Sequence, residues 1–109
     1  HLPDTVSTAY MLFYDFNEPT ADDGKDLLKE LAAVLELTGA TATINGFRDA
    51  AEDDDVDQAR VDEIRKFLNG QGVESDKFQV LARGVPPAIA VDDDGVTSRR
   101  VEVFIQPPS

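Results

Sequence analysis

The stretch TATINGFRDAAEDDDVDQARVDEIRKFL, residues 41–68, decides the fold. Its first part, residues 41–49, alternates apolar and polar side chains and stops at an acidic run, a pattern typical of a β-strand. Its last part, residues 56–68, predicts an α-helix, because apolar side chains fall near one helical face: Val56, Ile64, Phe67 and Leu68. The strand ends at Asp49, and Arg60 lies on the first turns of the helix, so we expect their side chains to converge on one crevice.

Asp49 and Arg60 allow two interpretations. As a binding site, the pair holds a zwitterion: the carboxylate accepts hydrogen bonds from an ammonium group, and the guanidinium binds a carboxylate through two parallel hydrogen bonds. As a surface ion pair, it contributes little stability and binds nothing. The spacing alone favours the ion pair, and the surrounding motifs shift the balance toward a binding site.

Outside this stretch, the pattern predicts three more strands and one more helix. Residues 8–16 are apolar and aromatic, as in a buried strand, and the helix that follows them ends at Gly39. This helix has a core-facing stripe of Leu27, Leu28, Leu31, Val34 and Leu35. Residues 77–83 and 98–106 are predicted to form the last two strands, and the loop between them, residues 84–97, contains prolines and an acidic run.

The resulting order β-α-β-α-β-β predicts an α+β two-layer sandwich, with a mixed four-stranded sheet and two helices on one face. Right-handed crossovers make the first three strands parallel where they are neighbours. Ligand sites of open sheets gather at the carboxyl ends of strands, and Asp49 lies at such an end.

Length and composition fit one compact domain. The chain has 109 residues, of which 41% are hydrophobic and 29% charged, as is ordinary for a globular protein. The formal net charge of −12 disfavours binding to nucleic acid or to an anionic membrane surface. No apolar run is long enough to span a bilayer, so we expect no direct membrane insertion by this domain.

Candidate catalytic and metal-binding groups are few. The chain has no cysteine and one histidine, at position 1, which argues against thiolate or multi-histidine metal sites and against histidine-based triads. No nucleophile has an adjacent base, so we expect no enzymatic activity and no cofactor. Two acidic runs, residues 53–57 and 92–95, lack the ligand spacing of a calcium loop, and we interpret them as solvated loops without a metal.

Four motifs occur in order along the chain: Phe13–Asn17 (FYDFN), Gly46–Asp49 (GFRD), residues 56–68 with Arg60 inside them, and Ser98–Val103 (SRRVEV). Together they resemble the OmpA-like family, the peptidoglycan-associated C-terminal domains of outer-membrane proteins, lipoproteins and flagellar stator proteins. The resemblance spans roughly residues 10–106.

The resemblance implies an architecture, a location and a function. It implies a single OmpA-like domain over residues 1–109, with its core at about residues 8–106, excised from a larger envelope protein. Such a domain would lie in the periplasm or cell envelope, tethered to the outer membrane by a part of the protein outside this chain. Its implied function is non-catalytic: it would anchor the envelope protein to peptidoglycan by binding the diaminopimelate of the stem peptide.

The resemblance also assigns site residues. Asp49 and Arg60 match the aspartate and arginine with which the family binds diaminopimelate. Asp49 would therefore accept hydrogen bonds from the ligand ammonium, and Arg60 would pair with its carboxylate. Ser98 and Arg99 would make secondary contacts.

The chain departs from the family pattern around this site. Phe47 and Arg48, which complete the set of ligand-binding candidates, replace the family's His and Thr, and Ser98 and Asn17 replace an Asn and an acid. The connection after Asp49 is about four residues shorter than usual, roughly one helical turn. These changes support an alternative: a divergent OmpA-like protein-interaction or structural module that has lost peptidoglycan binding and meets an envelope protein instead. In that alternative, the Asp–Arg pair is an internal salt bridge.

Overall fold

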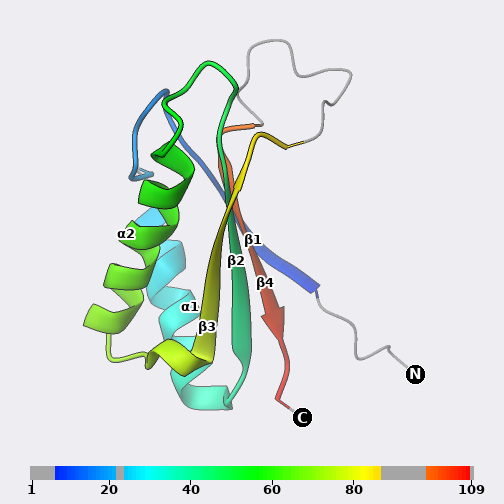
Figure 1. Ribbon diagram of the computed structural model, residues 1–109. Coiled ribbons are helices and arrows are strands. Elements are labelled where there is room, and N and C mark those ends of the chain that lie inside the picture. Colours follow the sequence, from blue (N-terminus) through cyan, green and yellow to red (C-terminus); the bar gives the residue numbers. More distant parts are fainter. Residues whose placement is uncertain (1–6, 22–23, 87–97, 109) are drawn as a thin grey trace.

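The computed structural model describes residues 7–21, 24–86 and 98–108, which form two helices beside a four-stranded sheet (Figure 1). The elements follow the predicted order, with a short 3-10 turn before the third strand: β1 (Ser7–Phe13), α1 (Gly24–Thr38), β2 (Thr41–Phe47), α2 (Val56–Gly70), η1 (Ser75–Lys77), β3 (Phe78–Gly84) and β4 (Arg100–Gln106). The predicted α+β class with a mixed sheet is confirmed. Neither of the helices in the described ranges is long and apolar enough to cross a membrane.

The sheet has the strand order β1-β4-β2-β3. β2 and β3 run parallel, as expected for strands joined through a helix, and β4 lies antiparallel between β1 and β2. Because β1 and β2 are both antiparallel to β4, their carboxyl ends lie at the same end of the sheet. Both helices cover one face of this sheet (Figure 1).

The hydrophobic core lies between the helices and the sheet. On α1, Leu31 and Leu35 of the predicted stripe are fully buried. On β4, Val101 and Val103 are fully buried whereas Glu102 between them is not, which is the alternation that the sequence predicts. The buried face of α2 carries Val56, Asp57, Arg60, Val61, Ile64 and Leu68, so one arginine shares the environment of the apolar side chains.

Helix α2 packs closely on the end of β2 at Gly46. A Cβ atom at this position would lie 2.5 Å from Val61 Cγ1 and 3.0 Å from the carbonyl oxygen of Asp57, so glycine is required for the contact. This close approach brings the first turns of α2, with Arg60, over the carboxyl end of β2.

Both strands are shorter than the sequence predicts. β1 stops at Phe13 and not at residue 16, and β2 stops at Phe47 and not at residue 49. Beyond β1, Asn17 adopts a left-handed backbone conformation with a φ of 58°. The carbonyl groups of Asp15 and Phe47 accept hydrogen bonds from Arg60. The strands therefore stop early because the chain curves around this arginine.

Candidate functional site

Arg60 is the centre of a polar site at the end of the sheet where β1 and β2 terminate. Its side chain is 0% exposed, and each of the five N–H groups of its guanidinium makes a hydrogen bond. Nε donates to the carbonyl of Glu18 at 2.9 Å. The two terminal nitrogens donate to the carbonyls of Phe47 at 3.1 Å and Asp15 at 3.2 Å. Their remaining N–H groups bind the carboxylate of Glu52 at 2.8 and 2.5 Å.

Glu52 is the carboxylate partner of Arg60, and it is itself only 4% exposed. Its Oε1 also accepts the backbone N–H of Asp49 at 2.9 Å, and its Oε2 accepts the backbone N–H of Asn17 at 2.6 Å. Burial by itself raises the pKa of Glu52, but the hydrogen bonds from Arg60 and from these two N–H groups outweigh it and hold the pKa below its ordinary value. Glu52 is therefore ionised, and each of its oxygens accepts two hydrogen bonds.

Tyr14 covers one side of the guanidinium. The Cζ atom of Arg60 lies 4.7 Å from the centre of the Tyr14 ring, a cation–π contact. Burial raises the pKa of Tyr14 far above its ordinary value, although Arg60 acts in the opposite direction, so the phenol stays neutral. The predicted site residue Arg99 reaches the site through Tyr14: its Nε donates to the Tyr14 carbonyl at 2.9 Å, and its own carbonyl accepts the Tyr14 N–H at 2.9 Å.

Asp49 lies beside the buried pair but is not the partner of Arg60. Its side chain is partly exposed, and its carboxylate makes no hydrogen bond or ion pair with the residues that the structure describes. Its backbone N–H, in contrast, is bound to Glu52. The backbone N–H of Asp49 and the guanidinium of Arg60 thus both bind the carboxylate of Glu52 and do not bind each other. The internal salt bridge of Arg60 is with Glu52.

Arg48 lies on the outer side of the same loop. Its NH1 donates to the carbonyls of Asp49 at 3.3 Å and Glu52 at 3.4 Å, and its NH2 pairs with the exposed Asp54 at 3.5 Å. Its Nε is buried and has no hydrogen-bond partner in the described part of the chain. Arg48 therefore borders the site and helps to fix the loop.

Phe47 meets the polar site through its backbone carbonyl, which accepts a hydrogen bond from Arg60. Because Gly46 faces α2, the ring of Phe47 points to the helix-free face of the sheet, where the guanidinium of Arg100 lies 4.8 Å from the ring centre. The carbonyl of Ser98 accepts the N–H of Arg100 at 3.0 Å. The structure does not bring the ring of Phe47 to the polar site.

Glu52 was missed by the sequence analysis. It directly precedes the acidic run of residues 53–57. It lies outside both the alternating pattern of the strand and the helical pattern of apolar residues that follows. The available signal was side-chain length, because a glutamate reaches farther back under a loop than the neighbouring aspartates do. Asp53, Asp54 and Asp55 remain exposed.

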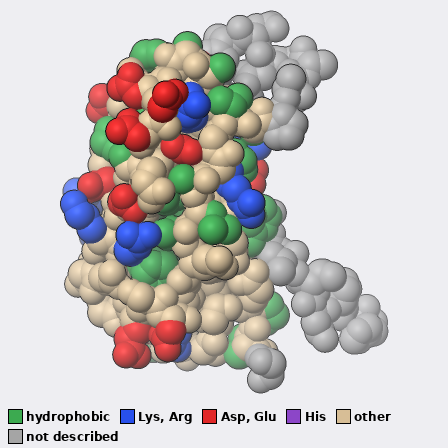
Figure 2. Space-filling view, viewed as in Figure 1, with side chains coloured by type: hydrophobic (Ala, Val, Ile, Leu, Met, Phe, Trp, Pro, Cys, Tyr) green, Lys and Arg blue, Asp and Glu red, His purple; other side chains and the backbone are tan. Residues whose placement is uncertain are grey.

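Acidic side chains gather at the end of the molecule where α2 begins (Figure 2). Among the described residues, however, no group of three or more His, Cys, Asp or Glu side chains is arranged to hold a metal ion. The second acidic run considered for calcium, residues 92–95, lies outside the described residues.

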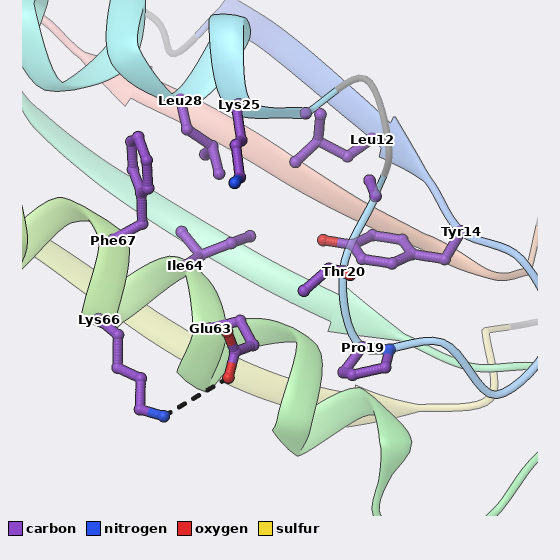
Figure 3. A pocket seen from close by; sticks show the side chains of 12 residues that line it. Leu12, Tyr14, Pro19, Thr20, Lys25, Leu28, Glu63, Ile64, Lys66 and Phe67 are labelled. Atoms are coloured by element: carbon purple, nitrogen blue, oxygen red, sulfur yellow. Dashed lines mark ion pairs between the residues drawn. The ribbon is translucent and has the colours of Figure 1, made fainter.

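A pocket of about 330 Å³ lies between α1 and α2, on the other side of Tyr14 (Figure 3). The hydroxyl of Tyr14 points into it, and Lys25 and Lys66 stand among its lining residues. Its walls are mainly apolar and include Leu12, Leu28, Ile64 and Phe67. The carboxylates of Asp49 and Glu52 do not line this pocket, and Tyr14 lies between the pocket and the polar site.

Comparison with known proteins relates this chain to solved structures. No family model and no curated protein matches the sequence. The peptidoglycan-associated lipoprotein from Burkholderia pseudomallei has a similar structure, with a TM-score of 0.74 at 22% identity, over 88% of this chain and 89% of that one. The OmpA-like domain of FopA1 from Francisella tularensis gives a TM-score of 0.73 at 12% identity, over 91% and 72%. The cell wall anchor of the T6SS from Pseudomonas aeruginosa gives 0.68 at 20% identity, over 86% and 74%.

These structural likenesses define the class of the domain. The chain has the OmpA-like fold, with two helices on one face of a mixed four-stranded sheet, as the order of its motifs predicted.

Proposed function

We propose that this domain is a non-catalytic module that binds peptidoglycan through the diaminopimelate of the stem peptide and so anchors an envelope protein to the cell wall. One observation carries the proposal: the carboxylate of Asp49 has no partner among the described residues, while its backbone is held by the buried Arg60–Glu52 pair. The fold supports the proposal, because the structures that share it include a peptidoglycan-associated lipoprotein and a cell wall anchor.

In this proposal, Asp49 accepts hydrogen bonds from the ligand ammonium. A hydrogen bond to a charged group contributes roughly 1.5–3 kcal/mol. Part of this is lost in immobilising the ligand, so one site binds weakly, with a dissociation constant on the order of micromolar to millimolar. Because a wall presents many stem peptides, several tethered domains would hold it more firmly through avidity.

The other site residues have graded parts in the proposal. Arg60 fixes the loop that carries Asp49, and it contacts a ligand carboxylate directly only if Glu52 moves away, since all its donors are occupied. Arg48 and Arg99 border the site, and in this proposal they and Ser98 supply secondary contacts to the ligand. Phe47 contributes its backbone carbonyl, which binds Arg60.

The proposal also extends to the whole protein. Residues 1–109 form one domain of a larger envelope protein, located in the periplasm. Another part of that protein tethers it to the outer membrane.

Retention on insoluble diaminopimelate-containing peptidoglycan tests the proposal. Asp49→Asn removes the charge at nearly constant size, and Asp76→Asn, in η1 at the other end of the sheet, is the matched control (Figure 1). We expect the wild type and Asp76→Asn to be retained and Asp49→Asn to be lost. Retention of Asp49→Asn at the level of the wild type would contradict the role of Asp49, and a wild type that is not retained would contradict the function.

A second candidate function is a protein-interaction or structural module that does not bind the wall. The complete use of the donors of Arg60 within the protein favours it, because the buried pair then serves stability alone. This function predicts that the wild type is not retained on peptidoglycan. It also predicts that Arg60→Ala lowers stability and leaves the binding of a protein partner by the folded domain intact.

A further inference from the structure

Glu52 occupies the place on Arg60 that a ligand carboxylate would need. Its two oxygens face the two terminal nitrogens at 2.8 and 2.5 Å, the bidentate geometry in which arginine binds carboxylates. The other three N–H groups donate to backbone carbonyls. A guanidinium has only five N–H donors, so none is left for an incoming anion.

Glu52 is also difficult to displace. It accepts two further hydrogen bonds, from the backbone N–H groups of Asn17 and Asp49, and it is almost completely buried. A carboxylate arriving from solution loses translational freedom on binding, whereas Glu52 is already tethered next to Arg60. The exposed Asp53, beside this loop, adds negative charge that opposes an anion.

We propose that Glu52 sets the ligand specificity of this site by closing its carboxylate-binding half and leaving only the ammonium-binding half at Asp49. The inference rests on the proposed function and names its substrate class. Diaminopimelate and lysine both present a side-chain ammonium, but only diaminopimelate carries a second carboxylate beside it. The wild-type site therefore discriminates little between stem peptides with diaminopimelate and those with lysine. When Glu52 is removed, Arg60 can bind the second carboxylate, and the site then prefers diaminopimelate.

The test uses free meso-diaminopimelate and Nα-acetyl-lysine amide (the lysine probe) on the 109-residue chain. The α-amino and α-carboxyl groups of the lysine probe are blocked, as they are in a stem peptide, so its side-chain ammonium has no carboxylate beside it. The wild type, Glu52→Ala and the control Glu74→Ala, an exposed glutamate just before η1, are titrated while the NMR signal of the Arg60 Nε–H is followed. In the wild type and the control, we expect affinities for the two probes within about twofold of each other and an Arg60 signal that does not move. In Glu52→Ala, we expect diaminopimelate to bind about tenfold more tightly than the lysine probe and to move the Arg60 signal.

Thermal unfolding provides a second readout that covers a poorly folded variant. Diaminopimelate should raise the melting temperature of Glu52→Ala, or of the isosteric Glu52→Gln if Glu52→Ala does not fold, by more than the same concentration of the lysine probe does. The inference is overturned if the wild type already prefers diaminopimelate tenfold with a shift at Arg60, or if the folded variants show no preference. Retention of the wild type on the insoluble wall decides the proposed function separately, because the free-ligand comparison in the variants does not depend on it.

Discussion

Arg60 and Glu52 dominate the molecule at the scale of the residue. Desolvation makes a buried ion pair costly, and it is retained where its geometry is good and every donor and acceptor has a partner, as here. The sequence identified Arg60 by its place at a helix start and Asp49 by its place at a strand end. It could not identify Glu52, because the path of residues 50–55 is set by tertiary contacts and follows no period.

The ionisation of Glu52 makes stability depend on pH. Its pKa in the folded protein lies below the ordinary value of 4.5, so the carboxylate contributes stability above pH 4.5 that is lost as the pH falls through the lower folded-state value. We predict that the free energy of unfolding, measured by urea denaturation, falls more steeply in acid for the wild type than for Glu52→Gln. The same acid dependence in both proteins would contradict the role of Glu52.

At the scale of the element, hydrophobic period predicted most of the structure. The stripe on α1 and the alternation of β4 both identify buried faces correctly. The ends of β1 and β2 were predicted too late, because the backbone there serves Arg60 instead of continuing the strand. The spacing of apolar residues shows which face of a helix or strand is buried. It does not show where a contact with another element ends a strand.

The contact between α2 and β2 at Gly46 gives a prediction at this scale. Gly46→Ala introduces a Cβ atom 2.5 Å from Val61 Cγ1, so we expect it to lower the free energy of unfolding by about 1–3 kcal/mol. Val61→Ala removes the clashing atom, and Gly46→Ala should therefore cost less in that background. Denaturant unfolding of the two single variants and the double variant measures this, and strictly additive effects would show that the close approach is absent.

At the scale of the whole molecule, the order of elements predicted the class, whereas the position of β4 between β1 and β2 is a tertiary property. The net charge of −12 is also a property of the whole molecule, and it produces repulsion among the acidic side chains of the folded chain. The buried Arg60–Glu52 pair is shielded from solvent ions, so salt acts mainly on the exposed acidic surface.

Salt is therefore expected to stabilise this protein. Raising the ionic strength from about 0.01 M to about 0.15 M shortens the Debye length from about 30 Å to about 8 Å and screens the repulsion between the acidic side chains. We predict a higher melting temperature at the higher salt concentration, measured by circular dichroism at pH 7. A melting temperature that falls with added sodium chloride would show that favourable surface ion pairs outweigh the repulsion.

Two double-mutant cycles on the free energy of unfolding test the account most directly. One combines Glu52→Gln with Arg60→Met, and the other combines Asp49→Asn with Arg60→Met. We predict a coupling of about 2–3 kcal/mol in the first cycle, because the two side chains form a buried bidentate pair, and a coupling within about 0.5 kcal/mol of zero in the second. A large coupling between Asp49 and Arg60, with little between Glu52 and Arg60, would contradict the account.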